Sequence, residues 1–397
     1  MTERNLDFDR IINRKNTDCL KYDFAVKRGM PADVLPLWVA DMDFETSSYI
    51  EDALVERAKM GIYGYSDAQT PYFEAVAGWM KRHHNWEPKE EWLIKTPGVV
   101  FALAMAVKAY TAPGDAVLIQ SPVYYPFSEV IADNGRRVVS STLVLGDDNR
   151  YHMDVADFEE KLKAENVKLF FLCNPHNPVG RVWTEEEIAK LGAICAKHNV
   201  IVVSDEIHSD LIMPGHKHVA FANACKNALP KYLVCTAPSK TFNLATLQTS
   251  NIVIPDEELR TKFQSVLQQH FTPSAGALGL EACRLGYTEC EGWLAEVIDL
   301  IYKNYKNFCK FIDVNCPGVT YSDLQGTYLM WIDCTTFGLD DEALDKLLHK
   351  HDLFCDAGTL FSKGGTMHTR VNLAGPEKML NAAMQRFKDA YDEAKNA

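Results

Sequence analysis

The feature that most constrains the fold is an alternation of short apolar runs with amphipathic helical segments in the middle of the chain. The apolar run 169–173 is followed by a capping box of Thr184 and Glu187, a helical apolar stripe, and a second apolar run at 200–203. A buried strand, a crossover helix and another buried strand form a βαβ unit of a parallel sheet. The sequence therefore predicts an α/β fold with a mainly parallel sheet covered by helices on both faces.

Polar clusters follow three successive strands of this predicted sheet. Residues 174–180 follow the first run, and residues 205–208 follow the second. A third apolar run, 232–236, leads directly into Ser239 and Lys240. Because ligands of open α/β sheets gather beyond the carboxyl ends of the strands, we expect the three clusters to form one site.

These clusters supply a lysine, a carboxylate and an amide that suit the aldehyde cofactor pyridoxal 5'-phosphate (PLP). Lys240 can bind the aldehyde as a Schiff base and, once displaced, act as a base over the substrate Cα. Asp205 ends an apolar strand, where burial favours a cationic partner such as a protonated pyridine nitrogen. Asn177, in a turn between two prolines, can direct its amide at the phenolate oxygen. A solvated loop lysine, and a helix cap or structural ion pair at Asp205, are the competing interpretations.

The phosphate group of PLP needs hydrogen-bond donors, and a predicted helix start supplies them. Gly98, Val99 and Val100 precede a helix-like segment, so their amides suit an anion, and Ser239 adds a hydroxyl. His208 is a second candidate donor to the phenolate oxygen. A plain helix start and a loop-capping histidine are the alternatives.

Two further residues are candidates for the ring and the substrate. Tyr124 is placed to stack on the cofactor ring, although an aromatic residue in such a run is often part of the core. Arg370 is a single cation in a strand-like segment, where its guanidinium would bind a substrate α-carboxylate through two parallel hydrogen bonds.

From about residue 289 the pattern changes to one long helix, with apolar residues at helical spacing up to residue 312. Strand-like and helical segments then alternate, which predicts a smaller α+β domain. The predicted strands are 318–321, 328–333 and 369–373, and the predicted helices are 340–351 and 376–394.

Composition excludes several classes of function. A formal charge of -13 without a long basic run argues against nucleic-acid binding. The N-terminus lacks the apolar stretch of a signal peptide or membrane span, so we expect a cytoplasmic protein without a membrane partner. The 11 cysteines are scattered and form no Cys-x-x-Cys pair, which indicates reduced core residues. The paired histidines 216/218 and 349/351 lack companion ligands, so no functional metal is expected.

Over nearly its whole length the chain resembles fold-type I PLP enzymes, the class I/II aminotransferase superfamily. Residues 37–44, 205–210 and 238–244 resemble the cystathionine β-lyase, or C–S lyase, subgroup. The resemblance implies a large domain with a mainly parallel seven-stranded sheet and a smaller α+β C-terminal domain. The expected division is an arm at 1–45 that contributes to the small domain, a large PLP-binding domain at 46–287, and a small domain at 288–397.

The same resemblance implies a role for each candidate residue. Lys240 is the Schiff-base lysine, Asp205 pairs with the pyridinium, and Arg370 and Ala40 contact the substrate. The implied cofactor-binding residues are Gly98, Val99, Val100, Tyr124, Asn177, Asp205, His208, Ser239, Lys240 and Tyr65. Tyr65 would reach the phosphate of the neighbouring subunit, which implies a homodimer with shared active sites.

Departures from the superfamily pattern favour the lyase subgroup. Many aminotransferases carry an arginine eight residues after the lysine and a small hydroxyl residue three before it, where this chain has Gln248 and Ala237. The arginine is also lost in the C–S lyase subgroup. Thr246 replaces a glycine common to both groups.

The resemblance implies β-elimination from an S-substituted cysteine such as cystathionine, which gives a thiol, pyruvate and ammonia. An aminotransferase is the alternative, because it uses the same groups to move a proton from Cα to C4'. A PLP-binding regulatory protein is a third hypothesis. Its usual mark is a fused DNA-binding module, and no spare segment of this chain is long or basic enough to be one.

Overall fold

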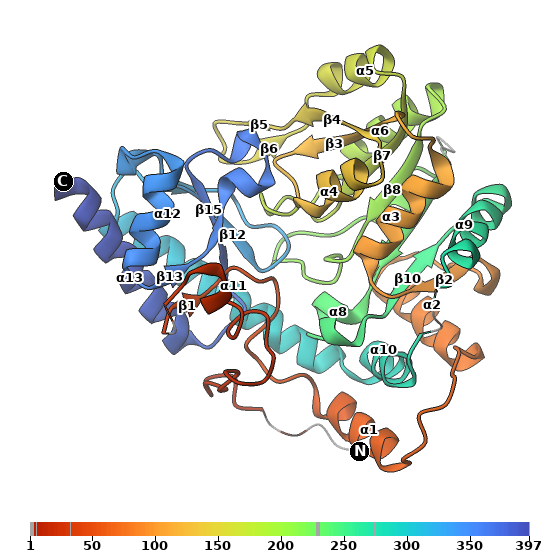
Figure 1. Ribbon diagram of the computed structural model, residues 1–397, viewed down its shortest axis with the longest axis horizontal. Coiled ribbons are helices and arrows are strands. Elements are labelled where there is room, and N and C mark those ends of the chain that lie inside the picture. The colour runs from red at the N-terminus through yellow and green to blue at the C-terminus, as the bar shows by residue number, and fades with distance from the viewer. Residues whose placement is uncertain (1–3, 5, 32, 228–230, 273–274, 397) are drawn as a thin grey trace.

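The computed structural model describes residues 4, 6–31, 33–227, 231–272 and 275–396. Residues 1–3 and 5 of the expected N-terminal arm lie outside the described residues. A seven-stranded sheet forms the centre of the molecule (Figure 1). In spatial order its strands are β2 (Leu93–Thr96), β10 (Ser250–Val253), β9 (Tyr232–Thr236), β8 (Ile201–Asp205), β7 (Val167–Cys173), β3 (Ala116–Ser121) and β4 (Arg137–Thr142).

The predicted, mainly parallel sheet is confirmed, with one antiparallel strand next to the edge strand β2. Strands β9, β8, β7, β3 and β4 pair in parallel. Strand β10 runs antiparallel to both of its neighbours, β2 and β9. The predicted crossover is also present, since α6 (Glu185–Lys197) joins β7 to β8 and begins with the capping box of Thr184 and Glu187.

The strand sequences explain why both faces of the sheet are covered. In β7, Leu169 and Phe171 pack into one core, whereas Phe170 and Leu172 pack into the other. Successive side chains of a strand point to opposite faces, so a continuous apolar run needs a cover on each side.

Helices form these two covers (Figure 1). One face carries α3 (Val99–Tyr110), α4 (Pro126–Asp133) and α9 (Glu257–Gln269). The other face carries α2 (Thr70–His84), α5 (Val155–Ala164), α6 and α10 (Ala277–Glu289), with α1 (Ser48–Lys59) packed on α10. Short elements complete this part: β5 (Val144–Leu145), β6 (Tyr151–His152), α7 (Phe221–Ala224) and α8 (Pro238–Thr241).

A second, four-stranded sheet occupies the C-terminal part, on the left of Figure 1. Its strands, in order, are β11 (Thr320–Tyr321), β12 (Leu329–Asp333), β15 (His368–Asn372) and β14 (Asp356–Ala357). The accompanying helices are α11 (Glu291–Asn315), α12 (Asp341–Lys350) and α13 (Glu377–Asn396). The predicted strands and helices of this region overlap these elements and are confirmed.

The N-terminal segment lies against the C-terminal part. Strand β1 (Leu35–Pro36) pairs in parallel with β13 (Leu353–Phe354). The backbone amide of Asn372 donates to the carbonyl of Leu37, which extends this contact toward β15. The division into 1–45, 46–287 and 288–397 stays a prediction.

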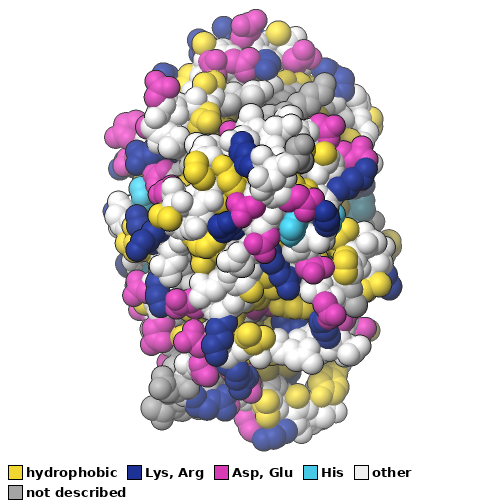
Figure 2. Space-filling view, turned by 90° about the vertical axis from the view of Figure 1, so that its left-hand side faces the viewer, with side chains coloured by type: hydrophobic (Ala, Val, Ile, Leu, Met, Phe, Trp, Pro, Cys, Tyr) yellow, Lys and Arg dark blue, Asp and Glu magenta, His cyan; other side chains and the backbone are white. Residues whose placement is uncertain are grey.

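The surface shows no single-sign charge field on the face drawn in Figure 2, where acidic and basic side chains are interspersed. None of the helices within the described ranges combines the length and the apolar content that crossing a bilayer requires.

Candidate active site

A cavity of ≈ 230 Å³ opens where β7, β8 and β9 end. Its position agrees with the rule that ligands of open α/β sheets bind beyond the carboxyl ends of the strands. The lining residues are Ala40, Pro97, Gly98, Val99, Val100, Phe101, Tyr124, Cys173, Asn177, Asp205, Ile207, His208, Ser239, Lys240, Ala245, Gln248 and Thr249. All sequence-predicted site residues except Arg370 and Tyr65 therefore line one cavity.

Lys240 lies on the short helix α8, which follows β9 directly. Its Nζ donates to the backbone carbonyl oxygen of Ala40 at 2.6 Å. Burial lowers the pKa of Lys240 to about 8, against a smaller raising effect of Asp41. The amine is therefore more easily deprotonated than an ordinary lysine, which is the property that a nucleophile or a general base needs.

Asp205 ends strand β8 and is 4% exposed. Its Oδ1 accepts a hydrogen bond from the backbone amide of Ile207 at 3.1 Å. Burial raises the pKa of this carboxyl to about 7. Among the described residues no lysine or arginine forms an ion pair with it, so the site holds a buried carboxylate that a cationic ligand would stabilise.

Arg370 lies beside the cavity, where residues from separate segments hold its guanidinium. Its Nη1 donates to Oδ1 of Asn177 at 3.0 Å, and its Nη2 donates to the carbonyl oxygen of Trp38 at 2.8 Å. Nη2 also pairs with the carboxylate of Asp356, which faces Arg370 across β14 and β15. Nε is buried and has no partner among the described residues. The amide oxygen of Asn177 is thus engaged, which leaves its Nδ2 to donate to a ligand.

Asp356 is a residue that sequence reasoning missed. Its buried carboxylate balances the charge of the Arg370 guanidinium and helps to hold the plane of that group. Without this partner the guanidinium would be less well oriented. Its only sequence mark is an acid within the apolar segment 353–357. The backbone carbonyl of Ala40 was also missed, because the sequence does not show where a carbonyl points.

The N-terminus of α3 borders the cavity with backbone amides that suit an anion. Gly98 caps this helix with φ +99, a backbone conformation that glycine adopts without strain. Its own amide donates to the carbonyl of Thr96 at 2.9 Å. Val99 and Val100 are the first two residues of the helix, where amides have no carbonyl partner within the helix, and Ser239 lines the same cavity.

Tyr124 and His208 form two walls of the cavity. The backbone amide of Tyr124 donates to the carbonyl of Asn177 at 3.0 Å, and burial raises the pKa of the Tyr124 phenol. The ring of His208 meets Tyr328 edge-on, with centroids 5.9 Å apart. Burial and the nearby charges of Lys240 and Arg370 hold the pKa of His208 well below its usual value. The imidazole is therefore neutral, and its buried Nδ1 has no partner in the described part of the chain.

Together these groups fit a ligand that carries an aldehyde, a basic ring nitrogen and a phosphate. The amine of Lys240 suits the aldehyde, and the uncompensated carboxylate of Asp205 suits a protonated ring nitrogen. The helix start at Val99 and Val100 suits the phosphate. These are the functional groups of PLP.

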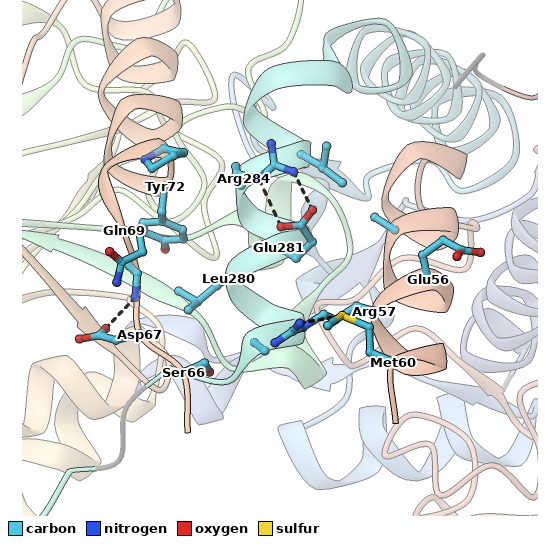
Figure 3. A pocket seen from close by; sticks show the side chains of 15 residues that line it. Glu56, Arg57, Met60, Ser66, Asp67, Gln69, Tyr72, Leu280, Glu281 and Arg284 are labelled. Carbon is cyan, nitrogen blue, oxygen red and sulfur yellow. Dashed lines mark hydrogen bonds and ion pairs between the residues drawn. The ribbon is translucent and has the colours of Figure 1, made fainter. Parts of the chain in front are cut away.

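Tyr65 lies outside this cavity. Its side chain is fully exposed, and it borders a different hollow with Thr246 and Leu247. A further hollow of ≈ 550 Å³ lies between α1, α2 and α10 (Figure 3). Its wall carries the ion pair of Arg284 with Glu281 and none of the predicted site residues. The role of Tyr65 stays a prediction.

Comparison with known proteins decides the family. The model of the family "Aminotransferase class I and II" matches residues 32–387. The chain belongs to this family. It is 40% identical to the cystathionine beta-lyase PatB of Bacillus subtilis, over 97% of this chain and 100% of that protein.

Solved structures agree with the family assignment. A PLP-bound putative aminotransferase from Clostridium difficile superimposes with a TM-score of 0.94 at 40% identity and covers 98% of this chain and 100% of its own. A PLP-bound C-S lyase from Staphylococcus hominis gives a TM-score of 0.91 at 30% identity and covers 98% of both chains. The expected PLP-enzyme fold is confirmed.

Proposed function

We propose that this chain is a PLP-dependent C–S lyase that cleaves an S-substituted cysteine such as cystathionine into a thiol, pyruvate and ammonia. The observation that carries the proposal is that one cavity holds both Lys240, whose pKa burial lowers to about 8, and the buried carboxyl of Asp205, which has no ion-pair partner among the described residues. The similarity to PatB, a cystathionine beta-lyase, and to the C-S lyase of Staphylococcus hominis supports the choice of reaction.

The residues that would hold PLP come from separate segments. Lys240 would bind the aldehyde, and Asp205 would keep the ring nitrogen protonated. Asn177 and His208 would donate to the phenolic oxygen, and the amides of Val99 and Val100 would bind the phosphate. When bound, PLP supplies an electron sink for the bond-breaking at Cα.

The substrate would be oriented by its carboxylate and deprotonated by the lysine. Arg370 would bind the α-carboxylate, because its guanidinium is already held in one plane by Asp356 and the Trp38 carbonyl. Once the substrate amine has displaced it from the aldehyde, Lys240 would take the Cα proton, since a pKa lowered to about 8 leaves far more of its amine neutral than in an ordinary lysine. The C–S bond at Cβ would then break, because a thiolate is a good leaving group. The aminoacrylate that remains, once released, reacts with one water to give pyruvate and ammonia.

A keto-acid requirement separates this proposal from the aminotransferase alternative. Purified PLP-loaded protein is given cystathionine without a keto acid, and pyruvate is followed over time. Steady pyruvate release, lost in Lys240→Ala and kept in the surface control Lys262→Ala, supports the lyase. Turnover that needs an added keto acid contradicts it and favours transamination.

We further propose a homodimer in which Tyr65 of each chain completes the partner's site. The proposal rests on the family resemblance and on exposed apolar side chains in one region: Ile62, Tyr63 and Tyr65 are 72%, 74% and 110% exposed. Such a group on a surface marks a protein interface.

Hybrid dimers test the shared site. Tyr65→Ala and Lys240→Ala proteins should each have little or no activity. The two proteins are dissociated into monomers, mixed and allowed to reassociate. If sites are shared, hybrids contain one intact site, and the mixture regains about a quarter of wild-type activity. A monomer in sedimentation experiments, or a mixture that stays at the level of its parents, contradicts the proposal.

We also propose a cytoplasmic location. All 11 cysteines are free thiols, and most are buried, which agrees with a reducing compartment. Cell fractionation with an antibody to the native protein would test this location.

A further inference from the structure

A buried ionic cluster lies next to the site but outside the residues that would touch cofactor or substrate. Its members are Lys21, Arg14, Asp41 and Asp43. We propose that Lys21 is a positioning residue for Lys240, because it fixes the strap, residues 38–43, whose Ala40 carbonyl holds the lysine amine. The inference rests on the proposed function of Lys240 as the reactive amine.

The ammonium group of Lys21 is fully buried, and its ion-pair partners are two carboxylates of the strap. Its side chain is 0% exposed, and its Nζ lies 2.5 Å from Oδ2 of Asp43 and 3.3 Å from Oδ1 of Asp41. Burying an ammonium is costly unless carboxylates surround it, so this ion pair holds the two acids in a defined place.

Arg14 completes the cluster from the outer side. Its Nη2 pairs with Asp41 at 2.5 Å, and its Nη1 pairs with Asp43 at 2.8 Å. The two positive charges of the cluster, on Lys21 and Arg14, therefore balance the two negative charges of its carboxylates. Burial alone would raise the pKa of Asp41, but Lys21 and Arg14 lower it below its ordinary value, so the acid is ionised.

The strap is held on its other side by two asparagines. Nδ2 of Asn372 donates to the carbonyls of Val39 and Asp41, at 2.7 and 2.6 Å. Asn243, three residues after the lysine, binds the strap through Met42, accepting from its amide and donating to its carbonyl, each at 3.0 Å.

The carbonyl of Ala40 lies between the two carbonyls that Asn372 binds, and Ala40 lines the cavity. It accepts from Nζ of Lys240 at 2.6 Å and from the hydroxyl of Tyr328 at 2.8 Å. The strap therefore determines where the free amine rests. A shift of the strap would move the base relative to the substrate Cα, and such small displacements reduce rates strongly.

The cluster also contributes to the electrostatic field at the amine of Lys240, through Asp41. The charged groups that act on its amine are Asp41, Arg370 and Asp205, of which Asp41 and Asp205 favour the protonated form. Removing Lys21 leaves the acids under-neutralised, which strengthens the negative field at Lys240. Removing the charge of Asp41 weakens that field. The two changes therefore act on the site in opposite directions.

Opposed variants separate this role from a general structural one. PLP-loaded Lys21→Met, Asp41→Asn and the double variant are titrated, and the pH at which the absorption of bound PLP changes is recorded. We expect Lys21→Met to raise this pH and Asp41→Asn to lower it, each by roughly one pH unit, with the double variant close to wild type. Lys27→Met, an exposed change in the same segment, should leave the pH unchanged.

Kinetics give the second measurement. Lys21→Met should lower kcat about tenfold or more with little change in KM, because the base is misplaced while Arg370 still binds the carboxylate. Lys21→Arg, which keeps the charge, should restore part of the rate.

The inference would be overturned if Lys21→Met titrates at the same pH as the wild type. It would also be overturned if Lys21→Met and Asp41→Asn shift this pH in the same direction. If Lys21→Met does not fold, an Asp41→Asn protein whose titration pH stays at or above the wild-type value overturns it. The absorption titration requires no lyase turnover. Failure of the C–S lyase assay with opposed shifts intact would therefore overturn only the proposed reaction.

Discussion

Asp205→Asn should stabilise the PLP-free protein at neutral and alkaline pH while weakening PLP binding. The carboxyl is 4% exposed, and burial raises its pKa from 3.8 to about 7. The folded chain therefore holds this proton more tightly than the unfolded chain does. Stability from this group is present in full below the unfolded pKa and is lost as the pH rises through about 7.

The size of the effect follows from the pKa difference. Each unit of difference corresponds to about 1.36 kcal/mol, so complete ionisation of Asp205 costs about 4 kcal/mol of unfolding free energy. Between about pH 5 and about pH 8 the wild type should lose about 3 kcal/mol relative to Asp205→Asn, which cannot ionise.

Urea unfolding of the PLP-free proteins across this pH range measures the difference. Asp299→Asn on the exposed side of α11 serves as the control, with no comparable pH-dependent difference expected. After saturation with PLP the order should reverse, because only the carboxylate pairs with the ring nitrogen. A difference between Asp205→Asn and wild type that does not vary with pH would refute the reasoning.

Three further variants test the site and the fold. Arg370→Lys should raise KM about tenfold or more with a smaller change in kcat, because an ammonium lacks the planar fork; steady-state kinetics showing an unchanged KM would contradict this. Gly98→Ala should cost roughly 1–3 kcal/mol of stability and weaken PLP binding, because φ is +99 at this position. The added Cβ would meet no atom within 4 Å, so the loss would come from backbone strain and not from a clash. Thermal unfolding and PLP titration measure the two effects, and wild-type values would exclude strain at this turn. Phe171→Ala, at a 1% exposed core position, should cost about 3–5 kcal/mol in urea unfolding, and a loss below about 1 kcal/mol would argue against its packing under α3 and α4.

The central part of the fold was predictable because its information is local. A strand buried on both faces must be a continuous apolar run, and the capping box of Thr184 and Glu187 marks the following helix in the sequence itself. The strand ends predict that Asn177, Asp205 and Lys240 lie together, and the structure places all three in one cavity. Their roles toward PLP stay predictions.

The remainder depends on contacts between distant segments. Strand β10 is a short segment of two polar and two apolar residues, and nothing local indicates that it joins the sheet antiparallel. The carboxylate of Asp356 meets Arg370 only because β14 pairs with β15. Lys21 is buried against Asp41 and Asp43, a contact between separate stretches of the N-terminal segment. Nothing in its sequence surroundings distinguishes it from a surface lysine.

The three partners of Arg370 come from the N-terminal strap, from the loop after β7 and from β14. The position of this guanidinium therefore depends on the folding of all three segments. The guanidinium reaches this arrangement only when three distant stretches of the chain have met, so the carboxylate binding proposed for Arg370 depends on contacts far from the cavity. A substitution that disturbs the pairing of β14 with β15 would therefore reach the cavity without touching any residue that lines it.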